Sequence, residues 1–193
     1  SSGTTGYPKM VSHDFTYPLG HILTGCFWHR VEEGGLHFTI ADTGWGKALW
    51  GKIYGQWLGG SAVLVYDFDQ FYPTDILKKI EKIKVTTFCA PPTMYRYMIK
   101  ADLSKYDFSA LKHCTTAGEA LNPEVFAQWK RQTGLRIFEG FGQTETTLCC
   151  LTVYPWMQPR LGSMGVAAPG YDVVICDEDG QEVGPGVVGE ICI

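Results

Sequence analysis

The sequence lacks the features that several large protein classes require. Charged residues make up only 19% of its 193 residues, and the formal net charge of −4 provides no basic footprint for non-specific binding to nucleic acid or to a membrane surface. No apolar run is long enough to span a bilayer, and no segment resembles a signal peptide. We therefore expect no nucleic-acid partner and no membrane association, while the targeting of a longer parent protein stays open.

Cysteine is present but without a recognisable arrangement. The seven cysteines form no CxxC pair and show no Cys/His spacing typical of zinc. An odd number without a disulfide framework predicts reduced thiols and a cytoplasmic location. No Ser/His/Asp or Cys/His constellation for nucleophilic catalysis is apparent either.

Glycine and apolar residues are plentiful. Hydrophobic residues reach 45%, which indicates a globular protein, and the length suits a single domain. The 23 glycines indicate many tight turns and positions where the backbone approaches a ligand closely.

The order of the apolar segments predicts an α/β fold. Strands are expected at 36–41, 62–66, 85–89, 113–116 and 135–138, and the second of these is apolar enough to be buried on both faces. Helices are expected between them, at 73–83, after Pro91-Pro92, and after Asn122 with Pro123 at the first helical position. Another is expected to run from Ser12-His13-Asp14 toward Trp28.

This alternation indicates crossover connections and a mainly parallel sheet with flanking helices. The α/β part is expected to occupy about residues 1–160. Segments 171–177 and 187–193, with the Asp179-Gly180 turn between them, predict a small antiparallel β region in the remainder, about 161–193.

The first nine residues have the chemistry of a phosphate cradle. They combine glycines, small hydroxyl side chains and one lysine, and the spacing differs from that of a Walker motif. The candidate phosphate-binding residues are Ser2, Gly3, Thr4, Thr5, Gly6 and Lys9. A solvated terminus of the same composition is the alternative.

Three further motifs follow in order: Thr116-Ala117-Gly118-Glu119-Ala120, Gly140-Phe141-Gly142-Gln143-Thr144-Glu145-Thr146, and Gly162-Ser163-Met164-Gly165 with Val166-Ala167-Ala168-Pro169-Gly170. Together with the opening segment, this set resembles the core motifs of the adenylate-forming superfamily, which includes acyl-CoA synthetases, firefly luciferase and the adenylation domains of peptide synthetases. The chain is most similar to medium-chain acyl-CoA synthetases. The resemblance covers essentially all 193 residues, and it indicates a central piece of a longer enzyme that also has an upstream part and a C-terminal lid.

The resemblance implies a role for each motif. Gly118, Glu119, Ala120 and Phe141 correspond to the adenine site, although family members usually have Tyr where Phe141 stands. Thr144 and Lys9 correspond to phosphate contacts, and Glu145 to the ligand of Mg²⁺. Neighbouring residues implied in nucleotide binding are Glu139, Gly140, Gly142 and Gln143.

The acyl group is expected to lie near Trp45, Gly142 and Met164. Acetyl-specific relatives carry Trp at the position of Gly142, so glycine there predicts acids longer than acetate, and Gly142→Trp is expected to shift the preference toward acetate. Plain core packing is the alternative for Trp45.

The implied reaction is ATP-dependent. A carboxylic acid attacks the α-phosphorus of ATP to give an acyl-AMP and pyrophosphate, and CoA then takes the acyl group as a thioester. The piece alone is expected to be inactive. The alternatives are an adenylation domain that passes the acyl group to a carrier-protein thiol, an enzyme with an aryl substrate pocket, a simple nucleotide-binding module, and a structural α/β domain with a chance glycine loop. The oligomeric state and the natural acid stay open.

Overall fold

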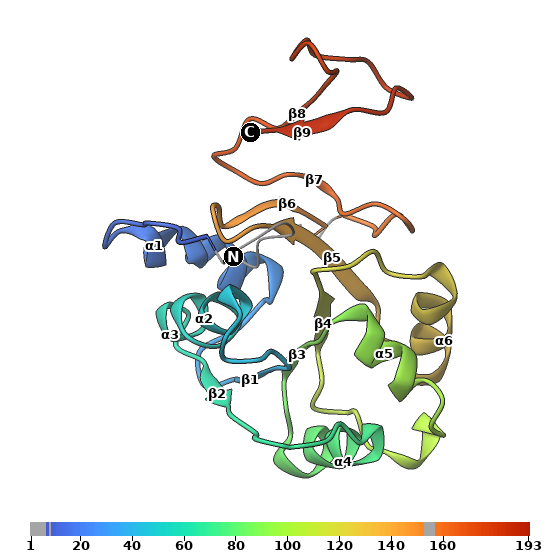
Figure 1. The fold of residues 1–193 in the computed structure, drawn as a ribbon. Helices are drawn as coiled ribbons and strands as arrows, with labels where there is room; N and C mark the ends of the chain where they lie inside the picture. The colour runs from blue at the N-terminus through green and yellow to red at the C-terminus, as the bar shows by residue number, and fades with distance from the viewer. Residues whose placement is uncertain (1–6, 8, 153–156) are drawn as a thin grey trace.

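The structure, a computed structural model, describes Tyr7, residues 9–152 and residues 157–193. Its described strands form a seven-stranded sheet in the order β2-β1-β3-β4-β5-β6-β7 and a separate two-stranded sheet, β8-β9 (Figure 1). The mainly parallel α/β fold and the small antiparallel region are therefore confirmed.

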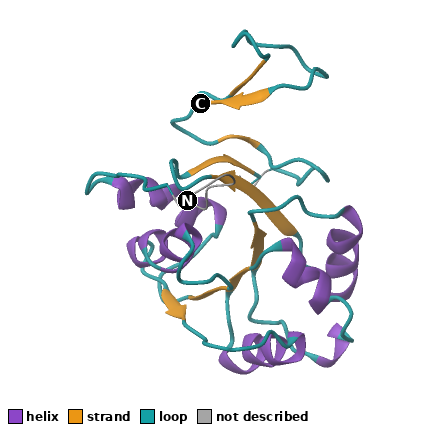
Figure 2. Cartoon of the chain, in the orientation of Figure 1, coloured by secondary structure: helices purple, strands orange, loops and turns teal. Residues whose placement is uncertain are grey.

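Five strands of the large sheet run parallel. They are β1 (Leu36–Thr39), β2 (Ala62–Leu64), β3 (Thr87–Cys89), β4 (His113–Thr116) and β5 (Ile137–Gly142). The sheet continues in antiparallel fashion through β6 (Leu148–Leu151) and β7 (Val166–Ala167). The hairpin strands are β8 (Val174–Cys176) and β9 (Glu190–Cys192). In Figure 2 this last part of the chain consists of strands and loops only.

Helices connect the parallel strands. The N-terminal ones are α1 (Tyr17–Ile22), a π-helix η1 (Leu23–Trp28), α2 (Gly46–Lys52) and α3 (Tyr54–Leu58). The later ones are α4 (Pro73–Ile83), α5 (Pro92–Met98), a short 3₁₀ helix η2 (Leu103–Lys105) and α6 (Pro123–Thr133). No helix in the described ranges is both long and apolar enough to cross a membrane.

Two apolar clusters hold the layers together. Residues of α4, α5 and α6, among them Leu77, Tyr95 and Trp129, pack with Phe38 and Phe88 of the sheet in the larger cluster. A smaller cluster contains Trp28 of η1 together with residues of β6, and Trp50 of α2 packs against it. The sheet is thus covered by helices from different parts of the chain.

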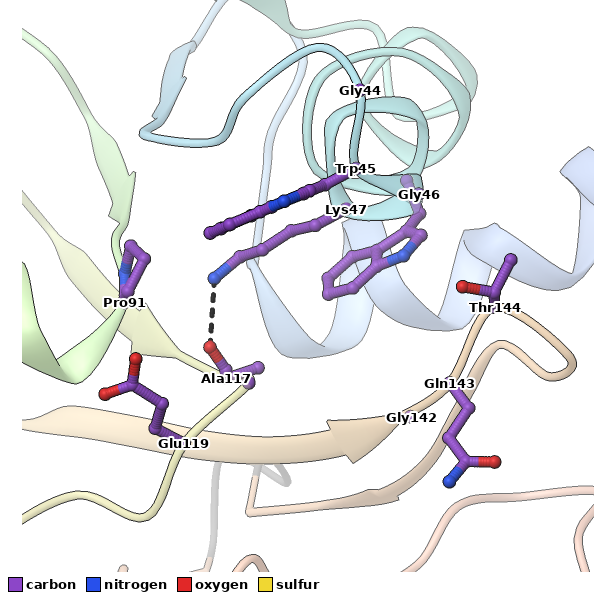
Figure 3. Close-up of a pocket in the computed structure, with 12 residues that line it drawn as sticks. Gly44, Trp45, Gly46, Lys47, Pro91, Ala117, Glu119, Gly142, Gln143 and Thr144 are labelled. Carbon is purple, nitrogen blue, oxygen red and sulfur yellow. Dashed lines mark hydrogen bonds between the residues drawn. The ribbon is translucent and has the colours of Figure 1, made fainter. Parts of the chain in front are cut away.

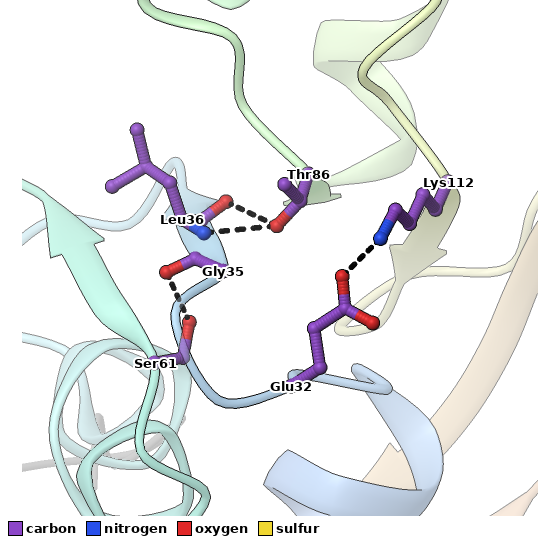
Figure 4. Close-up of polar contacts among 6 residues, drawn as sticks. All are labelled: Glu32, Gly35, Leu36, Ser61, Thr86 and Lys112. Atoms are coloured by element: carbon purple, nitrogen blue, oxygen red, sulfur yellow. Dashed lines mark hydrogen bonds and ion pairs between the residues drawn. The ribbon is translucent and has the colours of Figure 1, made fainter.

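Polar contacts join segments that lie at the starts of several strands of the large sheet (Figure 4). The Thr86 hydroxyl donates to the Leu36 carbonyl at 3.0 Å, and the Leu36 N–H donates to that hydroxyl at 2.9 Å. The Ser61 hydroxyl donates to the Gly35 carbonyl at 3.1 Å. Lys112, just before β4, forms an ion pair with Glu32, just before β1. These contacts stabilise the strand register at the amino ends of the parallel strands. They lie at the opposite end of the strands from the carboxyl ends, where ligands usually bind in such sheets.

Three expectations from the sequence were wrong. The segment at 62–66 is not buried on both faces, because β2 is an edge strand with a single neighbour, and Val65 is 72% exposed. The strand expected at 135–138 is displaced: β5 extends to Gly142, since antiparallel pairing with β6 carries it through the glycine motif. The helix expected to run from Ser12-His13-Asp14 toward Trp28 does reach Trp28, but it begins only at Tyr17 and becomes a π-helix after Ile22.

Candidate functional site

A cavity of about 750 Å³ lies at the carboxyl ends of the parallel strands. Its wall combines loops that follow β1, β3, β4 and β5, which is the usual place for ligands in such sheets. The lining residues are Gly44, Trp45, Gly46, Lys47, Trp50, Pro91, Ala117, Gly118, Glu119, Gly142, Gln143 and Thr144 (Figure 3). Segments far apart in the sequence therefore meet around one volume.

The turn after β1 positions Trp45. The side chain of Asp42 accepts a hydrogen bond from the Gly44 N–H at 2.7 Å, and its carbonyl accepts one from the Trp45 N–H at 3.0 Å. This turn starts α2 with Trp45 as its N-cap residue. Trp45 is 57% exposed and lines the cavity, so it is not a plain core residue.

Lys47 is a cavity residue that the sequence did not single out. Its Nζ donates to the Ala117 carbonyl at 3.1 Å, and the residue is only 8% exposed (Figure 3). The sequence around Lys47 does not signal this burial, because a lysine near the start of a helix is ordinarily solvated. Sequence reasoning also missed Trp50 and Pro91.

The segment after β4 forms a backbone rim. Gly118 has φ of +101°, a conformation that favours glycine, and Gly118 and Glu119 line the cavity. The Glu119 carboxylate accepts a hydrogen bond from the Thr93 hydroxyl at 2.8 Å. Ala120 is exposed and follows directly, outside the cavity lining.

The glycine motif of β5 is divided between scaffold and cavity. Gly142, Gln143 and Thr144 line the cavity. Glu139 and Gly140 lie beneath it: the Glu139 carbonyl accepts from the Trp28 indole N–H at 3.1 Å, and a Cβ at Gly140 would approach that ring to 2.8 Å. The Glu139 carboxylate accepts from the Leu121 N–H at 3.2 Å, and burial raises its pKa. These two residues therefore hold β5 in place.

Phe141 is half-buried and is not part of this cavity's lining. It pairs with Cys150 across the β5–β6 ladder, where its carbonyl accepts from the Cys149 thiol. An adenine ring stacked on Phe141 would thus lie beside the cavity rather than within it.

The N-terminal region supports the loop that carries Thr144 and Glu145. The His13 Nε2 lies 2.6 Å from the Thr144 carbonyl, and the Tyr17 hydroxyl donates to the Thr146 carbonyl at 2.9 Å. The rings of His13 and Tyr17 stack with centroids 3.7 Å apart. Burial raises the pKa of Tyr17 to about 12, so its hydroxyl stays a donor at neutral pH.

Glu145 is exposed in the middle of this loop, between β5 and β6. The described residues contain no group of three acidic, histidine or cysteine side chains able to hold a metal. A single carboxylate fits Mg²⁺ only as a shared ligand, because this ion is usually held by one or two carboxylates together with substrate phosphates.

Several expected site residues lie elsewhere. Met164 lines a separate hollow of about 360 Å³ beside β7, β8 and β9, so the structure does not bring it to Trp45 and Gly142. Lys9 is exposed and outside the cavity lining. Ser2, Gly3, Thr4, Thr5 and Gly6 lie outside the described residues.

A group of buried imidazoles lies within electrostatic reach of Lys47. His29 Nδ1 is 3.0 Å from the Thr115 hydroxyl, and the rings of His29 and His37 are 4.4 Å apart. Burial lowers the pKa of His29 well below its ordinary value, and the neighbouring His37 and Lys47 lower it further. Burial likewise lowers the pKa of His37 to about 3. The imidazoles of His29 and His37 are consequently neutral at physiological pH.

Comparison of this sequence with known proteins finds related enzymes. Mouse (Mus musculus) acyl-coenzyme A synthetase ACSM3, mitochondrial, is 42% identical over 194 residues, covering 100% of this chain and 33% of that protein. Human (Homo sapiens) acyl-coenzyme A synthetase ACSM5, mitochondrial, is 41% identical over 194 residues, with the same two coverages. The chain thus spans about a third of the length of these curated relatives. Their mitochondrial designation contradicts the cytoplasmic location expected from the cysteines.

Two solved structures share the fold closely. An anthranilate CoA ligase, AuaEII, in complex with anthranoyl-AMP superposes with a TM-score of 0.89 at 31% identity, over 99% of this chain and 37% of that one. An acyl-CoA synthetase from Brucella canis superposes with a TM-score of 0.88 at 30% identity, over 99% of this chain and 35% of that one. The model of the family described as AMP-binding enzyme matches residues 1–193. This chain therefore belongs to the family of AMP-binding enzymes, in agreement with the resemblance of its motifs to adenylate-forming enzymes.

Proposed function

We propose that the protein containing this chain is an ATP-dependent, AMP-forming acyl-CoA synthetase that acts on short- to medium-chain carboxylic acids. The observation that carries the proposal is the cavity itself. Motif residues that follow β1, β4 and β5 (Trp45, Gly118 and Thr144) surround one volume of about 750 Å³, within the range of small-molecule sites. By similarity to ACSM3 and ACSM5 we also propose a mitochondrial location.

The reaction needs activation because a carboxylate has no good leaving group. Attack of the acid's oxygen on the α-phosphorus of ATP forms a P–O bond and releases pyrophosphate. The CoA sulfur, after losing its proton, then attacks the acyl carbon and displaces AMP. Positioning and neutralisation of charge carry most of such catalysis.

The residues divide this work by their chemistry. We assign the acyl chain to the apolar surface of Trp45, Trp50 and Pro91, with Gly142 keeping the wall thin. The Thr144 hydroxyl is assigned to the α-phosphate, and the exposed backbone of Gly118, Glu119 and Ala120 with Phe141 to the adenine. Lys9 and the hydroxyl-rich segment before it are assigned to the other phosphates.

Mg²⁺ is part of the proposal as a charge-neutralising partner of the nucleotide. Glu145 is the residue that would hold it, jointly with phosphate oxygens. The metal would supply neutralisation of the developing phosphate charge, while the protein's own contribution is the exposed carboxylate and its place next to Thr144.

The experiment is an assay of the full-length protein with ATP, CoA and straight-chain acids of two to eight carbons. We expect pyrophosphate release and acyl-CoA, identified by mass spectrometry, with acids longer than acetate preferred. Thr144→Val should lower kcat by about a hundredfold through loss of one phosphate donor. Thr144→Ser keeps the hydroxyl and should keep most of the activity. Nucleotide binding without pyrophosphate release from any acid would contradict the proposal.

A further inference from the structure

The cavity contains a buried cation that the proposed reaction does not use. Lys47 is 8% exposed, and its ammonium group lies in the cavity wall among Trp45, Trp50 and Pro91. Lysine is almost never this buried unless it is paired, because removing an ammonium group from water is costly. The residue therefore needs a partner that the cavity can supply.

Among the described residues, Lys47 has only a weak hydrogen-bonding partner. Lys47 has three N–H donors, and the Ala117 carbonyl, a neutral acceptor, takes one of them at 3.1 Å. No acidic residue forms an ion pair with it in the described ranges. Glu119 is the single carboxylate of the lining, and it accepts from Thr93 instead. Two N–H donors of Lys47 are thus left for the contents of the cavity.

The lysine is held in this place. Its carbonyl partner, Ala117, is itself buried directly after β4, and the nearby buried imidazoles of His29 and His37 are neutral. Figure 3 shows the Lys47 side chain extended alongside Trp45 with Nζ directed at Ala117, whereas Thr144 lies on the opposite side of the drawn site. The ammonium group therefore faces a different part of the cavity from the hydroxyl that we assign to the nucleotide's phosphate.

We infer that Lys47 selects acids whose acyl part carries a second oxygen acceptor, such as an oxo or hydroxy group, in addition to the reacting carboxylate. This inference rests on the proposed function, since it names the substrate class of the same cavity. An acceptor oxygen would take one of the two remaining N–H donors in a charge-assisted hydrogen bond. A plain hydrocarbon chain would leave them unsatisfied in an apolar wall.

The test compares acids of equal length in the full-length protein. Pentanoate is measured against 2-oxopentanoate, 3-hydroxypentanoate and 4-oxopentanoate, which move the oxygen along the chain. We expect at least one oxygenated acid to exceed pentanoate about tenfold or more in kcat/KM, the effect of one hydrogen bond to a charged group. If pentanoate equals or exceeds all three, the inference is overturned, even if Lys47 variants cannot be prepared.

Variants separate recognition from a purely structural role. Lys47→Met should abolish the advantage of the preferred oxygenated acid while pentanoate improves or stays unchanged. Loss of the Ala117 contact alone would lower kcat/KM for all acids by the same factor, and that outcome would also overturn the inference. Lys52→Met is the matched control, because Lys52 lies on the same helix but donates to the Ala41 carbonyl at 3.1 Å, outside the cavity. Lys52→Met should leave unchanged the ratio of kcat/KM for the preferred oxygenated acid to kcat/KM for pentanoate.

The same assay distinguishes failure of the proposed function from failure of the inference about Lys47. If no acid in the set gives pyrophosphate release, the proposed function fails and takes this inference with it. If pentanoate is converted but the ratio and its response to Lys47→Met are absent, only the inference fails.

Discussion

At the scale of single residues, Gly142 shows how one position serves structure and site together. It was singled out because a glycine leaves room for an acyl chain, and it does line the cavity. The structure adds a second reason: a Cβ at Gly142 would lie 2.3 Å from the Thr147 carbonyl oxygen, where the β5–β6 register is irregular. Gly142→Trp would therefore disturb this strand pair before it filled the pocket, which makes it a poor test of chain length.

Gly142→Ala should destabilise the protein by about 1–3 kcal/mol, the usual cost of forcing atoms into a packed region. Gly46→Ala is the matched control, because it lies in the same cavity wall and its Cβ would make an ordinary 3.5 Å contact with the Thr144 hydroxyl. It should change stability by less than about 1 kcal/mol. Urea denaturation of both variants checks the pair, and equal stability of the two would contradict the argument.

The residues of the site were predictable to different degrees. Trp45, Gly118, Glu119, Gly142, Gln143 and Thr144 belong to motifs, and the structure brings them together. Lys47 could not be recognised, because a lysine on a helix is ordinarily solvated and its burial depends on Ala117, which lies 70 positions away. Met164 was expected at the acyl site, but it lies in the loop before β7 and lines another hollow.

At the scale of secondary-structure elements, local signals set the helices and long-range pairing set the strands. Asn122 and Pro123 predicted the start of α6, and the structure has the Asn122 cap with Pro123 as the first helical residue. The edge position of β2 and the existence of β6 depend on which strands pair in the folded sheet. Such pairing joins separate segments of the chain, so it cannot be predicted from the residues adjacent in sequence.

Asn122→Ala should cost about 1 kcal/mol of stability through loss of the α6 cap. The Asn122 side-chain oxygen accepts from the Glu124 N–H at 2.8 Å, and alanine leaves that donor without a protein partner. Asn122→Asp retains the acceptor and should restore most of the stability. Thermal denaturation of both variants provides the measurement. An alanine variant as stable as the wild type would show that packing of Val125 and Trp129 alone fixes the helix.

At the scale of the whole molecule, the buried histidines couple the fold to pH. Burial lowers the pKa values of His21 and His113 to about 4 and that of His37 to about 3, and it lowers that of His29 well below the ordinary range. Their ordinary pKa is about 6.5, so the unfolded chain binds more protons than the folded one between about pH 4 and 6.5. Stability must therefore fall as the pH is lowered through this window.

We expect the free energy of unfolding to be nearly constant between pH 7 and 8 and to decrease from pH 6.5 to 5. Each imidazole contributes up to about 1.4 kcal/mol per pH unit to the slope of the free energy of unfolding against pH. Glu139, whose pKa is raised by burial, opposes this trend, but it is one carboxyl against four imidazoles. His113→Gln keeps an N–H for the Trp28 carbonyl and should make the slope shallower by about one group's share. Urea denaturation at a series of pH values measures both slopes. Constant stability down to pH 5 would mean that these imidazoles take up protons in the folded protein, and the apolar packing around them would then need another explanation.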